Sequence, residues 1–505
     1  MPDVIHRQRT TARLIPIWVG AIALLPSGCA VGPDFVRPAA PDTKAYTAHA
    51  MPRQTVSSSS AAAQSLLTGK DIPAQWWNLF HSQALNALIK RAIEHSPDLQ
   101  AAQAALAEAQ ENAYAQEGSL FPALDASVSA RRQKVSGALF GNPSGLSTLF
   151  TLYNASVNVS YTLDVFGGVR RQIEALLAQA DFQRFQLEAA YLTLTANIVT
   201  TAIQEASLRA QIAATEAIVE ARSQQLAVVT RQFQLGGASR LDVLAQTANL
   251  EQIRATLPPL RLQLAQARHR LTVLAGELPS SELSAQFHLA DLQLPAELPL
   301  SLPSKLVAQR PDVRAQEAQL HAATAQIGVA TANLLPNLTL TASVGSIATQ
   351  LGNWFAPGSG IWNTALNLAQ PIFHGAEFIH KRRAALAAFQ QAAAQYRSTV
   401  LQAFQNVADA LRALEYDAET LRTQDASERA AADSLAVTRQ QYHSGAVSYL
   451  NLLDAENTYE QARIGQVKAQ AARYADTAAL FQALGGGWWN RADLTVSGSG
   501  KPTGG

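Results

Sequence analysis

The chain changes between two hydrophobic periodicities, one of two residues and one near three and a half. From Tyr153 to Val165 the odd positions are apolar or aromatic, and the even positions are Asn, Ser, Thr or Asp. This alternation is typical of a β-strand with one apolar and one polar face, and the run is long enough for a tilted strand to cross a membrane. A weaker partner lies at 124–130, and a second pair lies at 337–344 and 362–368.

Loops that contain Gly and Pro, at 131–150 and 345–361, separate the members of each pair, so the pattern predicts two β-hairpins. Polar faces of Ser, Thr and Asn suit a water-filled lumen, although one face of a soluble sheet is the alternative. Four strands cannot close a barrel, and an open sheet edge finds no hydrogen-bond partner in lipid. We therefore expect several copies of the chain to share one barrel. Aromatic side chains that could mark the membrane interface are Tyr153, Tyr161, Phe166, Trp354, Phe355, Trp362 and Phe373.

Two long stretches, 170–235 and 376–444, contain neither Gly nor Pro. As helices, each would extend about 100 Å, which exceeds an ordinary globular domain. A seven-residue spacing in both predicts packing along a coiled-coil seam. One row is Leu177, Arg184, Tyr191, Ile198, Glu205, Ile212, Val219, Leu226 and Phe233, and the other is Leu386, Ala393, Val400, Val407, Leu414, Leu421, Glu428, Leu435 and Tyr442.

Each long stretch ends in a short break before a second helical segment. A Gly just past a helix, followed by a Ser that caps the next helix, predicts a tight helical hairpin whose end points away from the strands. In the first return segment, Pro258 and Pro259 must interrupt or kink the helix. The break residues are Gly236, Gly237 and Ser239 in the first half, and Gly445, Val447 and Ser448 in the second.

The chain also repeats itself. A shift of 214 places Pro97-Asp98-Leu99 on Pro311-Asp312-Val313, and a shift of 209 places Gly236 on Gly445. Each half is therefore helix, β-hairpin and long helical hairpin, and so large a period indicates duplication rather than a repeat array. The expected organisation is a first repeat at 76–280, a linker at 281–310, a second repeat at 311–487 and a tail at 488–505.

The first residues have the order of an export signal. Basic residues precede an apolar run at 14–25, and Ser27 and Gly28 stand just before Cys29. The run is too short to span a bilayer. Small residues that end at a Cys are typical of a lipoprotein signal, although Pro26 stands where such signals usually have Leu. We expect a signal peptide at 1–28 and a lipidated arm at 29–75, with palmitate on Cys29; an ordinary cleaved signal is the alternative.

Composition limits the classes of function. The chain has 39 Lys and Arg against 38 Asp and Glu, a balance that gives no attraction to nucleic acid. Charged residues are 15% of the total, below the roughly 25% of soluble domains, so much of the surface should face lipid or another copy. Gly498-Ser-Gly-Lys501 lacks the strand and helix of a phosphate loop, and no nucleophile elbow or Cys cluster is present. We expect no enzyme activity, cofactor or metal.

Four motifs in order resemble the outer membrane efflux proteins, and specifically the NodT-type lipoproteins related to TolC and OprM. The resemblance covers about residues 29–490. The motifs are Cys29-Ala-Val-Gly-Pro-Asp-Phe-Val-Arg-Pro38, Trp76-Trp77-Asn-Leu-Phe80, Ser160-Tyr-Thr-Leu-Asp-Val-Phe-Gly-Gly168 and Gln309-Arg-Pro-Asp-Val-Arg314.

The resemblance implies an α+β membrane protein that forms a homotrimer. Three chains would each give four strands to a 12-stranded β-barrel in the cell outer membrane, continued by an α-helical coiled-coil barrel across the periplasm. The implied activity is passive. The trimer would be the exit duct of a tripartite efflux pump for drugs or toxic compounds, with a periplasmic adaptor and an inner-membrane RND-type transporter as partners. The hairpin ends would dock the adaptor.

The resemblance also implies a periplasmic aperture near the second hairpin end. The family has a Tyr, a Gly, an Arg two residues later and two Asp residues. Here the Tyr, the Gly and the second Asp match, while Val447 replaces the Arg and Asn451 replaces the first Asp. A ring of carboxylates would favour cations, and the alternative is that these Asp residues only stabilise helix N-terminal ends. The aperture candidates are Tyr442, Asn451, Asp454, Arg240 and Asp242.

Three other functions are distinguishable from this one. A type I protein-export duct would share the fold, and a neighbouring gene for an ABC transporter would favour it. A periplasmic coiled-coil lipoprotein without a channel would lack the alternating strands. An enzyme would need the motifs that are absent. The sequence does not name the exported substrate.

Overall fold

The computed structural model describes residues 30–136, 147–281 and 283–491, so Cys29 and the Gly498–Lys501 motif lie outside the described residues. The chain divides into two compact units. One contains Ala115–Glu174 and Ala325–Leu386 with the residues up to Asp34, and the other contains Phe35–Tyr114, Ala175–Thr324 and the residues from Ala387. Each unit draws on both sequence repeats, because each repeat contributes strands to the first unit and helices to the second.

The first unit is built on a four-stranded antiparallel sheet with the order β2-β3-β5-β6. Both predicted hairpins are present: β2 (Ala123–Val135) pairs with β3 (Thr148–Leu163), and β5 (Asn337–Ala348) pairs with β6 (Gly360–Ala369). The β3–β5 pair joins them, with Val157 opposite Val344.

The predicted loops at 131–150 and 345–361 were wrong in extent, because the strands run several residues further on both sides. At the ends of the strands next to the first loop, basic residues in β2 and apolar residues on both faces of β3 hide the alternation of polar and apolar positions. Backbone pairing continues regardless, since the ladder uses the N–H and C=O groups that every residue other than proline carries, and these strands contain no proline.

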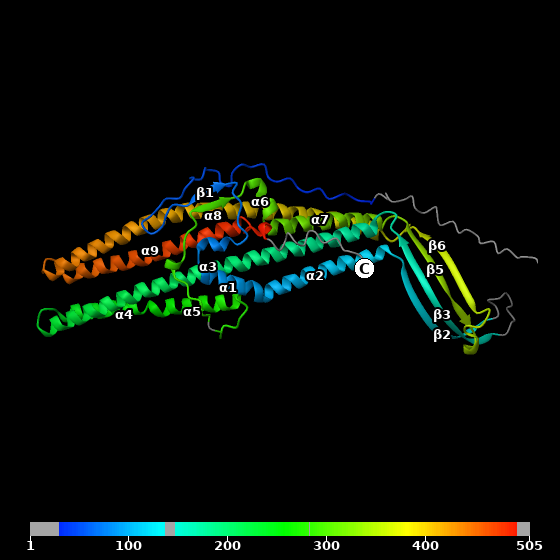
Figure 1. The fold of residues 1–505 in the computed structure, drawn as a ribbon, viewed down its shortest axis with the longest axis horizontal. Helices are drawn as coiled ribbons and strands as arrows, with labels where there is room; N and C mark the ends of the chain where they lie inside the picture. The colour runs from blue at the N-terminus through cyan, green and yellow to red at the C-terminus, as the bar shows by residue number, and fades with distance from the viewer. Residues whose placement is uncertain (1–29, 137–146, 282, 492–505) are drawn as a thin grey trace, which may run out of the picture. The chain divides into compact units, whose positions relative to one another are not determined.

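Long helices form the rest of the repeats. α3 (Gly168–Gln234) and α8 (Glu377–His443) each have 67 residues, as the Gly- and Pro-free stretches predicted. The return from α3 is split into α4 (Arg240–Arg254) and α5 (Leu257–Leu274), with Pro at the start of α5, which confirms the predicted interruption. The return from α8 is one helix, α9 (Tyr449–Ala483). Figure 1 shows α8 beside α9, and α3 beside α4 and α5.

Shorter elements repeat in the same order in both halves. α1 (Gln83–His95) and α2 (Pro97–Glu117) precede the first hairpin. α6 (Pro303–Gln309) and α7 (Pro311–Ala332) precede the second. The internal repeat is therefore confirmed in the element order. In the described residues, no helix combines the length and the apolar character needed to cross a membrane.

The core of the second unit lies around Trp76, which is fully buried and stacks on Phe481 with ring centroids 5.2 Å apart. The predicted seam of α8 is buried at Val400, Val407, Leu414, Leu421 and Leu435. The ends of the α3 row differ, because Leu177 and Phe233 are each 43% exposed within one chain.

The N-terminal arm makes ordered contacts with other parts of the second unit. Within this arm, β1 (Ser65–Thr68) pairs in parallel with β4 (Glu297–Leu300) of the predicted linker. The fully buried Arg473 of α9 donates to the Ala62 carbonyl at 2.8 Å and to the Thr55 hydroxyl at 3.0 Å. Asp425 of α8 accepts from the Ser60 backbone N–H at 3.0 Å. Sequence pattern missed these contacts, since the arm carries no hydrophobic periodicity.

Candidate functional site at the sheet faces and the helical tips

The sheet separates apolar from polar side chains across all four strands. Strand pairing places Val128 opposite Ala155, and Leu340 opposite Tyr161 and Leu366. Because neighbours in register point to the same side, one face is continuous from strand to strand. This apolar face contains Leu124, Ala126, Val128 and Ala130 of β2, Tyr153, Ala155, Val157, Val159 and Tyr161 of β3, Leu338, Leu340, Ala342 and Val344 of β5, and Trp362, Leu366 and Leu368 of β6.

The opposite face carries hydrogen-bonding side chains that contact each other across strands. The hydroxyl oxygens of Ser127 and Ser156 lie 3.0 Å apart, and the Asn158 amide donates to Ser127 at 3.2 Å. On the second hairpin, Ser343 donates to Asn363 at 3.2 Å. Most side chains on this face are short and neutral, and Asp125 and Arg131 of β2 are its charged residues. Hydrogen-bonding groups of this kind are well solvated, so this face is suited to line an aqueous passage.

Both edges of the sheet are open. β2 pairs only with β3, and β6 pairs only with β5, among the strands of the described chain. Their unpaired N–H and C=O groups need partners, because none are available in lipid. A single chain therefore presents an incomplete barrel wall.

The junction between β3 and α3 holds the residues that directly follow Cys29. The guanidinium of Arg171, whose side chain is 6% exposed, lies 2.6 Å from the Asp34 carboxylate and 2.7 Å from that of Glu174. It also donates to the Val31 carbonyl at 3.2 Å. A Cβ on Gly328 of α7 would come within 2.8 Å of that same carbonyl oxygen, so residues 30–34 pack tightly at this junction.

The first tip, residues 235–239, ends α3 with a glycine in the left-handed region. Gly236 has φ 80°, and the Gly237 N–H donates to the Gln232 carbonyl at 2.8 Å, which closes the helix end. Ser239 then caps α4. Its hydroxyl accepts from the Asp242 N–H at 3.2 Å, and the Asp242 carboxylate accepts from the Ser239 N–H at 2.8 Å. This reciprocal pair is a capping box.

The Asp242 carboxylate is stabilised in its charged form. Hydrogen bonds from the Ser239 hydroxyl and the Ser239 backbone N–H lower the pKa of Asp242 below its usual value. The aperture candidate of the first tip therefore also acts as a helix cap, and the two roles are compatible. Arg240, the other candidate here, is exposed.

The second tip, residues 444–448, repeats the backbone and changes the cap. Gly445 has φ 74°, and the Ala446 N–H donates to the Gln441 carbonyl at 2.8 Å. Ser448 stands at the N-cap of α9, but its side chain makes no capping hydrogen bond. Its hydroxyl instead donates to the Asn451 side-chain oxygen at 2.5 Å. The predicted Ser cap is therefore confirmed in position, while its hydroxyl serves a different contact.

Polar contacts join the two helical hairpins close to the tips. The Tyr442 hydroxyl donates to Gln232 of α3 at 3.4 Å, and the Tyr449 hydroxyl donates to Gln246 of α4. Burial, followed by the charge of Asp242, raises the pKa of Tyr442. Tyr442 and Asp242, predicted separately, are thus electrostatic neighbours.

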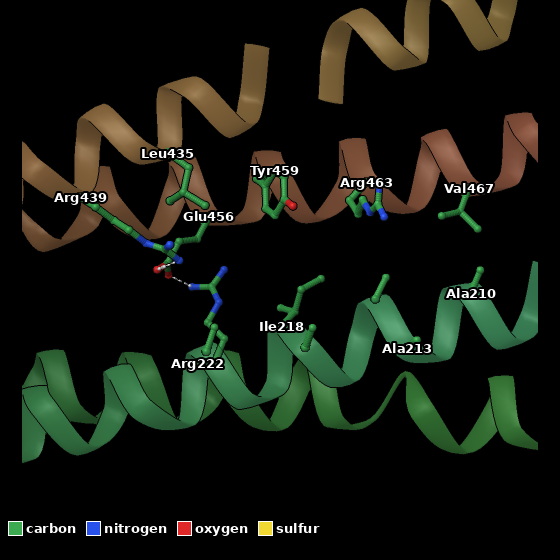
Figure 2. Close-up of a pocket in the computed structure, with 13 residues that line it drawn as sticks. Ala210, Ala213, Ile218, Arg222, Leu435, Arg439, Glu456, Tyr459, Arg463 and Val467 are labelled. Carbon is green, nitrogen blue, oxygen red and sulfur yellow. Dashed lines mark ion pairs between the residues drawn. The ribbon is translucent and has the colours of Figure 1, made fainter. Parts of the chain in front are cut away.

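A buried ion pair that the sequence pattern did not single out also joins the two helical hairpins. Arg222 of α3 lies 2.6 Å from Glu456 of α9, with side chains 2% and 8% exposed (Figure 2). Arg222 also donates to Asn457 at 2.8 Å, and Arg439 of α8 lies 3.6 Å from Glu456. The sequence offered one indication of this contact, because Arg222 is a charged residue on the otherwise Ala-rich side of α3.

Two grooves adjoin these contacts. One, of about 640 Å³, is lined by the Ala-rich side of α3 and by α8 and α9, with Arg222 and Glu456 at its edge. The other, also about 640 Å³, lies between α8 and α9 and brings together Val447, Asn451 and Asp454. Three residues predicted at the second tip therefore line one polar groove.

Comparison with known proteins gives a consistent result. A family model described as outer membrane efflux protein matches residues 88–277 and 302–486. The chain is 29% identical over 482 residues to the toluene efflux pump outer membrane protein TtgC of Pseudomonas putida, covering 95% of this chain and 97% of that protein.

Two further relatives support the match. The chain is 30% identical over 417 residues to the pyoverdine export outer membrane protein OpmQ of Pseudomonas aeruginosa, covering 82% of this chain and 87% of that protein. The solved structure of the outer-membrane channel OprN is similar at a TM-score of 0.81 and 26% identity, covering 91% of this chain and 100% of that one.

Proposed function

The chain belongs to the outer membrane efflux protein family and forms an outer-membrane efflux channel, and we propose that three copies build the passive exit duct of a tripartite pump for small molecules. The observation that carries this proposal is the four-stranded sheet with one apolar face, one polar face and two open edges. Because the strands alternate in direction, β6 of one copy can pair antiparallel with β2 of the next. Three copies then close a 12-stranded barrel without a free edge.

The substrate class follows from the lining and from the relatives. Neutral Ser, Thr and Asn side chains on the polar face pass solutes without selecting one, so selectivity rests with an inner-membrane transporter. The names of TtgC and OpmQ specify toluene and pyoverdine, and that of CusC of Escherichia coli, 29% identical over 489 residues, specifies cations, so the relatives support small solutes in general. We propose an RND-type transporter and a periplasmic adaptor as partners, with the adaptor docking at Gly236, Gly237, Ser239, Gly445, Val447 and Ser448.

The resting aperture is assigned to the tips. Tyr442, Asp242, Asn451 and Asp454, with Arg240 beside them, would meet their copies around a threefold axis. The groove that contains Val447, Asn451 and Asp454 and the proximity of Tyr442 to Asp242 support this assignment. With Asn at 451, the ring carries one carboxylate per chain on α9 at this level rather than two.

Acylation of Cys29 fits the junction described above. Residues 30–34 are held beside the start of α3, at the end of the sheet where the chain passes into the helices. A lipid on the preceding Cys would enter the leaflet on that side. Labelled palmitate should enter the wild type and not Cys29→Ser.

Planar-bilayer recording tests the duct and its aperture together. Wild-type protein should migrate as a trimer and conduct with a preference for cations. Asp454→Ala should raise the single-channel conductance and lower the cation preference, because a carboxylate ring attracts cations and narrows the passage. Asp433→Ala, an exposed carboxylate of α8 outside the groove, is the matched control and should change neither quantity.

Two results would contradict the assignment at different levels. Trimers of Asp454→Ala with wild-type conductance and ion preference would place the aperture elsewhere and leave Asp454 as a helix residue. Wild-type protein that forms no trimer and no conducting channel would contradict the duct itself.

A further inference from the structure

Two cations extend the apolar face of β2 beyond its last apolar residue. Leu124, Ala126, Val128 and Ala130 alternate along this face, and Arg132 and Lys134 follow at the next positions in the same register. Arg132 is opposite Thr151 and Lys134 is opposite Leu149 of β3. Both side chains are exposed.

Their depth matches the outer boundary of the hydrocarbon. Leu124 to Arg132 is eight residues, or about 26 Å along a strand at roughly 3.3 Å per residue. With a strand tilt of about 40°, this length rises about 20 Å to Arg132 and about 25 Å to Lys134, and the apolar band of an outer-membrane barrel is about 25 Å tall. The chain enters and leaves this hairpin through the helices at the Ala123 end, so with periplasmic helices, as proposed above, the Val135 end faces outward.

The two β-hairpins supply no carboxylate beside these two cations. The sequence from Ala126 to Leu163 contains no Asp or Glu, and the second hairpin, 337–369, contains no charged residue. The nearest carboxylate in these strands is Asp125 of β2, seven residues before Arg132 and on the opposite, polar face, and a second copy brings no other. Arg131 shares the polar face with Asp125, whereas Arg132 and Lys134 lie on the apolar face, where these strands carry no acidic residue.

We propose that Arg132 and Lys134 form a docking surface for phosphorylated glycolipid of the outer leaflet. The leaflet on this side of a bacterial outer membrane consists largely of a glycolipid whose sugar head carries phosphate groups. A guanidinium binds a phosphate through two parallel hydrogen bonds, and an ammonium two residues away on the same face adds a second donor. The acyl chains of that lipid would lie along Leu124–Ala130.

Arg131 provides an internal control for this proposal. It is adjacent in sequence and carries the same charge, but it lies on the opposite, polar face, opposite Leu152. Its removal changes the net charge of the strand as much as removal of Arg132 does, without touching the lipid side.

The experiment measures lipid A binding to purified trimers by native mass spectrometry, with bis-phosphorylated and dephosphorylated lipid A as probes. Arg132→Gln/Lys134→Gln should bind the phosphorylated lipid roughly thirtyfold more weakly than wild type, at about fivefold per surface cation. Arg131→Gln should bind like wild type, and Arg132→Lys, which keeps the charge, should retain most of the affinity. Millimolar inorganic phosphate should not displace the lipid, because it lacks the acyl contacts.

Several outcomes would overturn the inference. Equal weakening by Arg131→Gln would show a general charge effect, equal affinity for dephosphorylated lipid would show an apolar belt only, and displacement by inorganic phosphate would show a soluble-anion site. Trimer mass and conductance are recorded in the same samples. Conducting trimers without preference for the phosphorylated lipid refute this inference alone, whereas wild-type protein without trimers refutes the proposed function on which it rests.

Discussion

The two helical tips have the same backbone and different chemistry. At both, a left-handed glycine ends the long helix, and the next N–H closes onto a carbonyl five residues back. At the first tip, Ser239 and Asp242 form a charged capping box. At the second, Ser448 and Asn451 contact each other, and the side chain of Ser448 leaves the helix end uncapped.

The difference shows which part of a duplicated motif is fixed. Glycine is required at each tip by φ, since an L side chain in the left-handed region is strained. The cap is replaceable, because water and the joint between the hairpins can satisfy or restrain the second helix end. The first tip is held by its own hydrogen bonds, and the second depends more on its neighbour through Tyr442, Tyr449 and Glu456.

The largest expected effect comes from breaking the joint. Glu456→Ala leaves Arg222 buried without its carboxylate partner. Breaking a buried ion pair in this way destabilises comparable proteins by about 3 kcal/mol, which raises the equilibrium constant for local opening of the hairpins roughly a hundredfold. Hydrogen exchange should rise at the second tip more than at the first. Glu251→Ala removes an exposed pair with Arg254, with side chains 59% and 46% exposed, and should change exchange little. Equal effects from both variants would contradict the role of the joint.

Next in size is the loss of a tip glycine. Gly236→Ala and Gly445→Ala should each destabilise their tip by about 1–2 kcal/mol, because φ is positive at both. Gly237→Ala is the control. Its Cβ would meet only the Gln232 carbonyl oxygen at 3.6 Å, and the second tip already has Ala446 at the equivalent position. Amide exchange at 230–245 and 440–455 measures the difference, and an equal cost for Gly237→Ala would show that φ is not the cause.

A smaller effect separates the caps. Ser239→Ala should loosen the start of α4 by about 1 kcal/mol, because it removes a side-chain acceptor for the Asp242 N–H. Ser448→Ala removes no backbone hydrogen bond and should leave exchange at the start of α9 almost unchanged. If Ser239→Ala and Ser448→Ala destabilise their helix starts equally, Ser448 caps α9 in solution, and the proposed difference between the tips is wrong.

The smallest effect is in the pH dependence. The pKa of Asp242 is lowered by Ser239, so its contribution to the first tip is fully present above the ordinary Asp pKa near 4. That contribution is lost as the pH falls through the lower folded value. Asp242→Asn should remove this acid sensitivity, and Asn451→Asp should create it at the second tip. Amide exchange rates measured between pH 5 and pH 3, and corrected for the intrinsic pH dependence of exchange, would show this acid sensitivity. A second tip that stays insensitive to pH in Asn451→Asp would mean that no capping box forms there.

Much of the fold was predictable because its periodicities are local. A strand with two environments alternates every two residues, and a long helix excludes Gly and Pro, so β3, α3 and α8 follow from composition along the chain. The tips were predictable for the same reason, since Gly236 and Gly445 end their helices by adopting a positive φ, which depends on the glycine itself. The strand ends near Val135 and Thr148 were not, because pairing there depends on the partner strand rather than on side-chain polarity.

The sequence by itself determined the duplicated order of elements, the amphipathic strands, the long helices and the glycine positions, each of which depends on residues close together in the chain. Tertiary structure alone decided that Arg222 meets Glu456, that Arg473 binds the N-terminal arm and that Asp34 meets Arg171. These contacts join residues far apart in sequence, and their burial makes each charge depend on a partner that no local pattern specifies. The roles of Asp242 and Asn451 stayed local, since each contacts the serine three residues before it, and only Asp242 forms a capping box.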